Sequence, residues 1–362
     1  MLRLGSHLGM KHISLTLALV VIATLGPAPA QARVRLCNGY KVTKAGTNGN
    51  DTLRGTPKRD VIAGLGGNDV IRGADGRDIL CGGRGRDTLY GQRDNDFLDG
   101  DRGKDLLLGG RAGDGGTGDE GADELRMGTG DDWIEVGEDS GRDLIDGGPG
   151  PDFIDLSVTD PSEGEPDDAS GPAFVDLATG VVNSADGGEN QVVVGTVENV
   201  YGTGAGDEIH GDEGPNVLDP GYNGGGTLYG RGGGDILTAG QDGGTTYFGG
   251  AGNDIINPLE SNEIDGGAGT DELDFCGPSA RISLDISVDI ARGRSEVRYR
   301  DEVFGINNFV EIEDVITCGG DDELLGDEKD NLLDSGPDHD SIDGREGSDT
   351  CLGGEEVANC EA

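Results

Sequence analysis

Apolar side chains recur along this chain with a period of nine residues. Ten consecutive nine-residue units run from 46 to 135, and two more run from 138 to 155 after a slip of two residues. The eighth place of these units is Leu or Ile everywhere except at Gly116. One large apolar residue in nine is too sparse for the apolar face of a helix. The pattern instead predicts very short strands that each bury one side chain.

The polar places of the unit are as regular as the apolar one. The sixth place is Asp in all twelve units, and the first and fourth places are mostly Gly. Glycine suits a backbone that turns at positive φ, so the unit is interpreted as a turn followed by a strand. Carboxylates stacked at one place repel each other unless a cation lies between them. Calcium, which takes six to eight oxygen ligands, fits that need.

Units such as 64–72 and 73–81 resemble the GGxGxDxUx nonapeptides of RTX (repeats-in-toxin, or hemolysin-type) calcium-binding proteins. The resemblance implies an all-β fold, a right-handed parallel β-roll or β-helix solenoid with two nonapeptides per coil. Six-residue turns would hold several Ca²⁺ ions, using the sixth-place carboxylates and backbone carbonyls of the same turns. Neighbours on one side would be eighteen residues apart, so that Asp69 stacks with Asp87 and Asp105.

The repeat weakens twice and returns in phase. Gly226 and Thr245 occupy the sixth place in two later units, and Lys58 replaces the fourth glycine of an early one, so these turns are expected to bind calcium poorly. The residues predicted as metal ligands are Asp51, Asp60, Asp69, Asp78, Asp87, Asp96, Asp105, Asp114, Asp123, Asp132, Asp143, Asp152, Asp207, Asp235, Asp254, Asp271, Asp322, Asp340 and Asp349.

The breaks in the period define the expected organisation. It is a signal peptide at 1–32, an N-terminal cap at 33–45, a first β-roll at 46–155, an interruption with an acidic loop at 156–192, a second and degenerate roll at 193–274, a second interruption at 275–307, and a third roll with a C-terminal cap at 308–362. Both interruptions contain strand-like segments. One long solenoid with two elaborated coils is favoured over separate globular domains.

Composition narrows the choice of partners. The chain has 362 residues, 71 of them Gly, a formal charge of -44 and only 33% hydrophobic residues. Such a composition by itself indicates disorder, but stacked repeats need few apolar residues because neighbours complete the core. The acidity argues against nucleic acid and anionic membranes as partners and favours cations.

The N-terminus reads as an export signal. Arg3, Lys11 and His12 form a positive region, residues 13–25 are apolar, and Ala30-Gln31-Ala32 matches an A-x-A cleavage site. No membrane span is expected in the mature chain. We therefore expect a secreted protein that is extracellular or lies at the cell surface.

Six cysteines follow the predicted signal, an even number that indicates disulfides in an exported protein. Fifteen pairings are possible. Cys276 and Cys318 bracket the second interruption and are well placed to staple it. Cys351 and Cys360 share the eighth place of consecutive units, which puts them on opposite walls, too far apart for a bond unless the roll narrows at its end.

Motifs of catalysis are missing from the sequence. It contains no G-x-S-x-G and no H-E-x-x-H. We therefore expect no enzyme, but a calcium-binding repeat protein with a structural or interaction role. One alternative is a polysaccharide-active lyase or epimerase that uses the basic cluster Arg292, Arg294, Arg298 and Arg300, although a solvated strand face is favoured there. Another is an adhesin whose partners are cell-surface or matrix components. Trp133 is interpreted as a packing residue.

Overall fold

The computed structural model describes residues 36–118, 120–136, 142–157, 171–183, 189–221, 225–238, 244–258, 261–276, 284–299 and 302–361. The predicted signal peptide and the acidic loop at 160–168 lie outside these residues. Everything described below belongs to one compact unit, Arg35–Ala362.

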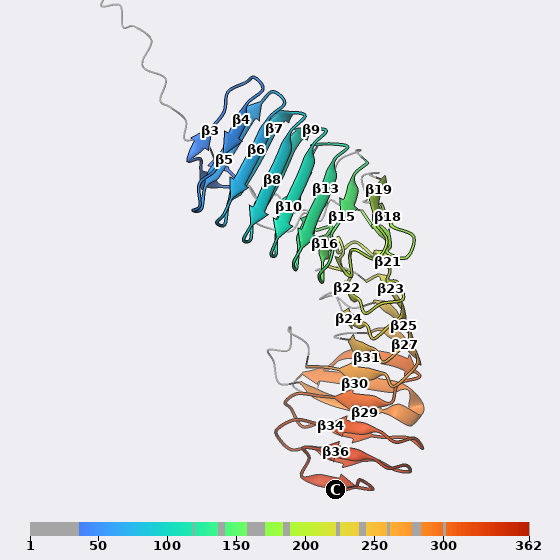
Figure 1. Ribbon diagram of the computed structural model, residues 1–362. Coiled ribbons are helices and arrows are strands. Elements are labelled where there is room, and N and C mark those ends of the chain that lie inside the picture. Colours follow the sequence, from blue (N-terminus) through green and yellow to red (C-terminus); the bar gives the residue numbers. More distant parts are fainter. Residues whose placement is uncertain are drawn as a thin grey trace, which may run out of the picture. The chain divides into compact units, whose positions relative to one another are not determined.

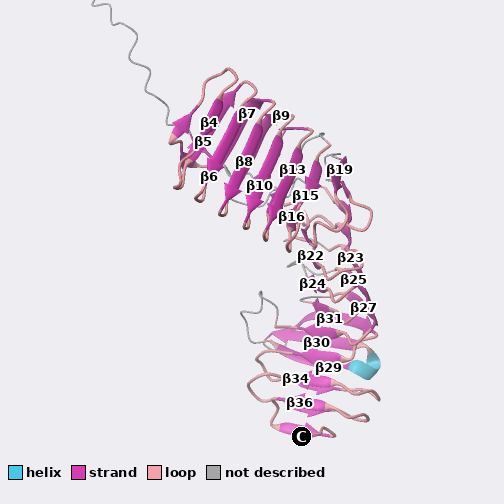
Figure 2. Cartoon of the chain, in the orientation of Figure 1, coloured by secondary structure: helices cyan, strands magenta, loops and turns pink. Residues whose placement is uncertain are grey.

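The described chain is an all-β solenoid built from two sheets of short strands, as the nonapeptide pattern predicts (Figures 1 and 2). The chain alternates between the two sheets, so that each coil adds one strand to each wall. The one helix among the described residues is a single 3-10 turn, η1 (Ile290–Arg292).

The first sheet is parallel throughout. Its strands are, in spatial order, β3 (Lys44–Ala45), β5 (Val61–Gly66), β7 (Ile79–Gly85), β9 (Phe97–Gly103), β11 (Gly115–Thr117), β14 (Trp133–Glu135), β16 (Phe153–Asp155), β20 (Asn199–Tyr201), β22 (Val217–Asp219), β24 (Ile236–Thr238), β26 (Ile255–Asn257), β28 (Glu272–Asp274), β32 (Asp314–Ile316), β34 (Leu332–Asp334) and β36 (Thr350–Leu352). β12 (Glu120–Gly121) also pairs with β9, and β1 (Leu36–Cys37) with β2 (Tyr40–Lys41) forms a separate antiparallel pair before the first coil.

The second sheet contains the remaining strands and is mostly parallel. Following the pairings, these are β4 (Thr52–Arg54), β6 (Val70–Ala74), β8 (Thr88–Arg93), β10 (Leu106–Arg111), β13 (Glu124–Thr129), β15 (Leu144–Asp146), β19 (Glu189–Val192), β18 (Val181–Asn183), β17 (Phe174–Asp176), β21 (Glu208–His210), β23 (Thr227–Gly232), β25 (Thr246–Ala251), β27 (Glu263–Ala268), β31 (Glu302–Val310), β30 (Arg294–Tyr299), β29 (Asp285–Asp289), β33 (Glu323–Leu325), β35 (Ser341–Asp343) and β37 (Glu356–Ala358).

The interruptions of the period are three-stranded antiparallel inserts in the second sheet. In the first, β19 stacks on β15, the chain of pairs continues through β18 and β17, and β17 stacks under β21. The second repeats this order with β31, β30 and β29 between β27 and β33. The first sheet continues unbroken past both, since β16 pairs with β20 and β28 with β32.

The eighth-place side chains form one continuous core between the two walls. Leu80, Leu89, Leu98 and Leu107 are all 0% exposed, and in β8 and β10 the residues on either side of the buried leucine are only half-buried. A coil therefore contributes one large apolar side chain per wall and relies on the coils above and below to cover it.

The exception at the eighth place shows how tightly this core is filled. Gly116 leaves a gap in the column, and Met127, which stands where most units have their first glycine, is 0% exposed. A Cβ added to Gly116 would lie 3.0 Å from the Met127 Cε. The flexible methionine thus fills the space of the missing side chain.

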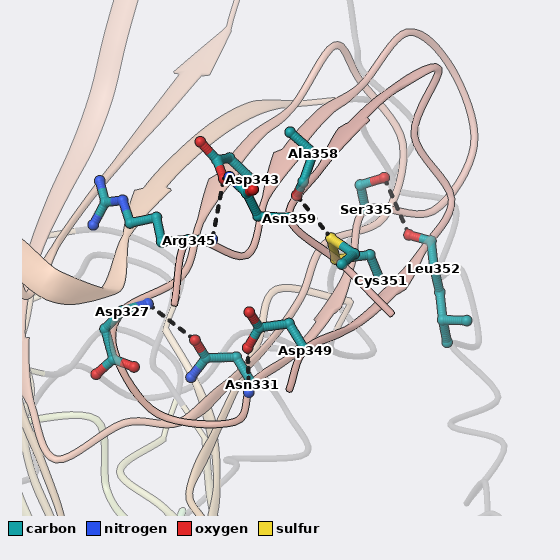
Figure 3. The surroundings of a disulfide bond; sticks show 11 residues. Asp327, Asn331, Ser335, Asp343, Arg345, Asp349, Cys351, Leu352, Ala358 and Asn359 are labelled. Atoms are coloured by element: carbon teal, nitrogen blue, oxygen red, sulfur yellow. Dashed lines mark hydrogen bonds between the residues drawn. A yellow bond between two sulfur atoms is a disulfide. The ribbon is translucent and has the colours of Figure 1, made fainter. Parts of the chain in front are cut away.

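Three disulfides join the six cysteines. Cys37–Cys81 ties the N-terminal pair of strands to β7, and Cys276–Cys318 spans the second insert, as the sequence suggested. The expectation for the third pair was wrong, because Cys351 and Cys360 are bonded, with their Cα atoms 5.8 Å apart (Figure 3).

The reason is a shortened last turn. Ile342 pairs with Val357 where an uninterrupted period would have brought Cys360. The chain therefore returns early to the other wall, where Glu361 bridges Thr350 beside Cys351. The two cysteines lie in neighbouring layers of one wall rather than on opposite walls.

Two adjacent leucines of β10 test the inward and outward places. Leu107 is buried and Leu108 is half-buried on the outer face. We expect Leu107→Ala to lower the free energy of unfolding by about 2–5 kcal/mol, because it leaves a cavity in the core. Leu108→Ala is expected to cost about 1 kcal/mol or less. Urea unfolding in excess calcium measures both, and equal losses would contradict the assignment of the eighth place.

Candidate calcium-binding turns

The predicted ligands lie where each turn enters a strand, and nearly all of them are buried. Seventeen of the nineteen predicted aspartates are at most 5% exposed, whereas Asp51 and Asp60, in the first coil, are half-buried. Each is followed at once by the outward residue of a strand. Because side chains alternate along a strand, the eighth-place residue, two after the aspartate, then points into the core. The same short segment therefore positions both the carboxylate and the leucine.

One carboxylate oxygen of each sixth-place residue belongs to a ladder along the solenoid. The backbone amide of Asp69 donates to Oδ1 of Asp87 at 2.6 Å, and that of Asp87 donates to Oδ1 of Asp105 at 2.6 Å. On the other side of the coil, the Asp78 amide donates to Oδ1 of Asp96 at 2.8 Å. The structure thus confirms the expected stacking of residues eighteen apart.

The ladder also follows the slips of the period. It joins Asp123 to Asp143 and Asp132 to Asp152 across twenty residues. Farther along, Asp235 is joined to Asp254 across nineteen residues.

The second carboxylate oxygen is left without a protein partner. At most sixth places Oδ2 is buried and no described residue donates a hydrogen bond to it. This holds for Asp69, Asp78, Asp87, Asp96, Asp105, Asp114, Asp132, Asp152, Asp235, Asp254, Asp271 and Asp349. A buried polar atom without a partner is costly, and a repeated row of such atoms points to a ligand that they share.

The first-place glycine forms a cradle beside this free oxygen. A Cβ on Gly64 would lie 2.3 Å from Asp69 Oδ2 and 2.5 Å from the carbonyl oxygen of Gly82, one coil later. Gly230 shows the same arrangement, with Asp235 Oδ2 at 2.3 Å and the Gly249 carbonyl oxygen at 2.4 Å. Only glycine leaves this space open, and the space is lined by oxygens of the kind that calcium prefers.

Carboxylates alone do not complete a site. Among the described residues, no group of three or more His, Cys, Asp or Glu side chains gathers around one point. The remaining ligands of an ion would therefore have to be backbone carbonyls, which the cradle supplies and which the resemblance to RTX repeats implies. On this chemistry the turns fit calcium, which Oδ2 of the sixth-place residue and backbone carbonyls of the turns would hold.

The electrostatics of the turns also favour a bound cation. Burial, with a smaller contribution from the neighbouring carboxylates of Asp114 and Asp78, raises the pKa of Asp96 to about 8, against the lowering effect of the Asp78 amide. Burial likewise raises the pKa of Asp105 to about 8 and that of Asp235 to about 7. The ionised row is therefore unfavourable without a proton or a metal ion on it.

Four predicted ligands differ from this pattern because a hydroxyl of their own turn occupies them. The Thr47 hydroxyl donates to Asp51 Oδ2 at 2.8 Å, and a threonine or serine hydroxyl binds the carboxylate in the same way at Asp60, Asp207 and Asp340. These turns fit calcium less well. The sequence signal was the hydroxyl residue at the first or second place, which the count of aspartates and glycines overlooked.

The ladder passes through the inserts with residues that the period did not predict. Oδ1 of Asn190 accepts from the Asp143 amide at 3.0 Å, and Oδ1 of Asn307 accepts from the Asn262 amide at 3.0 Å. Glu355 ends one column by accepting from the Asp340 amide at 2.9 Å. Asn190 and Asn307 lie in strands of the inserts, where counting by nines from the preceding roll does not reach.

The other residues singled out in the sequence lie outside these turns. Trp133 stacks on Phe153 with ring centroids 4.5 Å apart on the outer face of the first sheet, which agrees with a packing role. In the basic cluster, Arg294 and Arg298 both pair with Glu296 of their own strand, and Arg292 pairs with Asp289. Arg300 lies outside the described residues.

The cradle predicts different effects for two glycines of one turn. Gly64→Ala is expected to weaken calcium binding about tenfold or more, since its Cβ would meet both Asp69 Oδ2 and a backbone carbonyl. Gly66→Ala, whose Cβ would lie no closer than 3.6 Å to its neighbours, is the control and should bind as the unaltered chain does. Calorimetric titration with Ca²⁺ compares them, and equal affinities would contradict the cradle.

The raised pKa values predict that the calcium-free fold is sensitive to alkaline pH. In the unfolded chain these carboxyls titrate near their ordinary pKa of about 4, whereas in the fold the pKa of Asp96 and Asp105 is about 8. The folded form therefore binds more protons between these values and loses stability as pH rises through them. With chelator, circular dichroism should show β structure decreasing from about pH 5 to about pH 9, and calcium should restore it. A β signal that stays constant or grows with pH in chelator would contradict this.

Comparison with known proteins agrees with the geometry of the turns. The family described as RTX calcium-binding nonapeptide repeat (4 copies) matches residues 45–80, 82–115, 117–154, 239–257 and 319–351. No curated protein matches the chain.

Among solved structures, the chain is similar to extracellular lipase LipA from Serratia marcescens. Sequence identity is 20% and the TM-score is 0.19, over 62% of this chain and 39% of that chain. A similarity at this level says nothing about the activity of this protein. The segments that the RTX family model matches include the regular first roll and parts of the two later rolls. The chain therefore contains calcium-binding nonapeptide repeats of the RTX family.

Proposed function

We propose that this protein is exported and that its Asp-lined coils fold when calcium binds to them outside the cell. The observation that carries the proposal is the row of buried Oδ2 atoms without protein partners. A row of ionised carboxylates holds the calcium-free chain open, and an ion on each cradle removes that repulsion. Binding energy then becomes folding energy, because the cradle exists only when successive coils are stacked.

Export is supported by two independent features. The three disulfides are of the kind that persist in oxidising surroundings, and the first 32 residues have the composition of a signal peptide. In the described part of the chain, no helix has the length and apolar character needed to cross a membrane. Extracellular calcium modules bind at roughly 10⁻⁴–10⁻³ M, so ions present outside the cell would fill the turns.

We further propose that the role is structural or one of interaction, without catalysis. The carboxylates and glycines that recur in the repeat all lie in the turns themselves. The arginines that a polysaccharide lyase or epimerase would need are engaged with Glu296 and Asp289. A surface or matrix partner, as in an adhesin, is compatible with the same fold and would be recognised by the outer faces of the sheets.

Calcium titration tests the proposal. We expect weak β structure in excess chelator, and full β structure after addition of calcium with a midpoint on the order of 10⁻⁴–10⁻³ M. Circular dichroism follows the folding, and native mass spectrometry counts the ions. Magnesium, which demands a tighter octahedral site, is the control cation and should not replace calcium. A full β signal in chelator, or turnover of uronate polymers by the folded protein, would contradict the proposal.

A further inference from the structure

The first insert contains an arginine contact that the nonapeptide pattern does not explain. Arg231, near the end of β23, donates to both carboxylate oxygens of Asp176 in β17 with its two terminal nitrogens, at 2.8 and 3.0 Å. Its Nη1 also donates to the carbonyl oxygen of Gly211 at 3.0 Å. The pair is largely shielded, with the Asp176 side chain 13% exposed. Burial alone would raise the pKa of Asp176, but the hydrogen bonds from Arg231 hold it below its ordinary value.

The second insert has a similar contact, which its arginine makes with one nitrogen rather than two. Nη1 of Arg345 donates to Asp289 of β29 at 2.8 Å and to the carbonyl oxygen of Gly326 at 2.8 Å. The two pairs are separated by 55 and 56 residues along the chain. Both arginines occupy the second place of their units at positive φ, 73° for Arg231 and 68° for Arg345. Each insert is thus held by an arginine that binds both an insert aspartate and a first-place carbonyl.

The carbonyls that these arginines bind have a particular place in the solenoid. In the regular coils, the first-place carbonyl faces the cradle of the coil before it, as the Gly82 oxygen faces Gly64. Gly211 and Gly326 are first-place residues too, but in the coil before each of them the carbonyls that face the preceding first-place glycines, Gly147 and Gly266, belong to Thr196 and Glu311. A side chain stands there in place of glycine, so the cradle is not formed, and the carbonyl accepts from a guanidinium instead.

The carboxylate column changes character at the same two coils. The sixth place is Glu at 198 and 313, and the residue one coil later is Asn rather than Asp. The side-chain nitrogens (Nδ2) of Asn216 and Asn331 donate to the backbone carbonyl oxygens of Glu198 and Glu313, at 2.9 and 2.8 Å. At the second insert the Lys329 ammonium also pairs with Glu313. Negative charge is reduced and positive charge is supplied by the chain itself.

We propose that Arg231 and Arg345 provide, at the two insert coils, the positive charge that calcium provides in the Asp-lined coils. A guanidinium is permanently charged and binds a carboxylate in a bidentate fashion. The insert coils therefore stay folded without calcium. They are the templates on which the Asp-lined coils re-form, because solenoids grow by adding coils to a folded neighbour. This rests on the proposed calcium-driven folding and adds where it begins.

Hydrogen exchange on the unaltered protein in excess chelator, with its disulfides intact, is the first test. We expect the amide protons of β17, and of β21 and β23 that stack on it, to exchange with rates about tenfold or more below those of β10 and β13. Here these three strands are called the first insert coil. The factor is that expected of charge-assisted hydrogen bonds. The first insert is the better target, because Cys276–Cys318 spans the second and would protect it by itself.

A pair of arginine variants gives the second test. Arg231→Gln should remove the protection of β17, β21 and β23 in chelator while leaving the number of bound calcium ions unchanged. Arg93→Gln is the matched control, because Arg93 also lies at the end of a strand, β8, but its ion pair with Asp75 is long, at 3.5 Å, and exposed. It should change neither quantity. Arg231→Lys, which keeps the charge and loses the bidentate geometry, should show intermediate protection.

The outcomes separate this inference from the proposed function. If chelator leaves exchange unchanged along the whole chain, calcium-driven folding itself is wrong. If chelator exposes the first insert coil as fast as β10 and β13, or if Arg231→Gln keeps its protection, the arginine does not replace the ion. A calcium count that changes in Arg231→Gln would also overturn the inference, since it would place an ion where the guanidinium lies.

Discussion

The structure depends on one electrostatic constraint, the stacking of like-charged carboxylates inside a narrow solenoid. The backbone forces this stacking, since the amide of each sixth-place residue needs the Oδ1 atom one coil later as its acceptor. The same bond brings the next carboxylate in from solvent and leaves its other oxygen without a protein partner. The hydrogen-bond ladder that orders the turns therefore also builds the charge that opposes them. Either a proton or a divalent cation can remove this repulsion between carboxylates. A proton does so by neutralising the carboxylate, whereas a cation leaves the carboxylate ionised.

The apolar core cannot overcome that repulsion by itself. Each coil buries one large side chain per wall, and the walls are only three residues long in many coils. Burial of one such side chain is worth about 1.5–3 kcal/mol, which is comparable to the cost of ordering a few residues. The disulfides strengthen the solenoid where the ladder is least able to, at the N-terminal cap, across the second insert and at the last coil.

Much of this arrangement could be predicted from sequence because a strict period turns into a column in space. The eighth place became the core and the sixth place became the ladder, including the slips that lengthen a coil. The strand pairing in the inserts was harder to predict. β15 pairs with β19 and β17 pairs with β21, so the paired strands are not eighteen residues apart as in the regular coils. The pairing of Cys360 was missed for a related reason. Counting nine residues from Cys351 puts Cys360 on the opposite wall. The last turn is shorter than the period, so Cys360 lies on the same wall as Cys351.

Hydroxyl residues in the turns were missed because they do not alter the period. Thr47 and Thr56 leave the aspartate in place but satisfy the oxygen that a cation would use. The number of aspartates at the sixth place therefore overstates the number of good calcium turns. What matters is the combination of Asp at the sixth place, Gly at the first place and no hydroxyl within reach.

The two oxygens of the sixth-place side chain have separable roles, and the substitutions along the ladder show it. Asn190, Asn307 and Glu198 keep an oxygen that accepts from the preceding coil, so the ladder is not broken where they stand. What Asn190 and Asn307 lack is the second, charged oxygen. These residues lie in or beside the inserts, where the hairpin strands and the arginine pairs hold the coils together. Aspartate thus stands along the regular coils, where the first-place glycine leaves its second oxygen uncovered, and asparagine replaces it in the inserts, where hairpin strands join the layers.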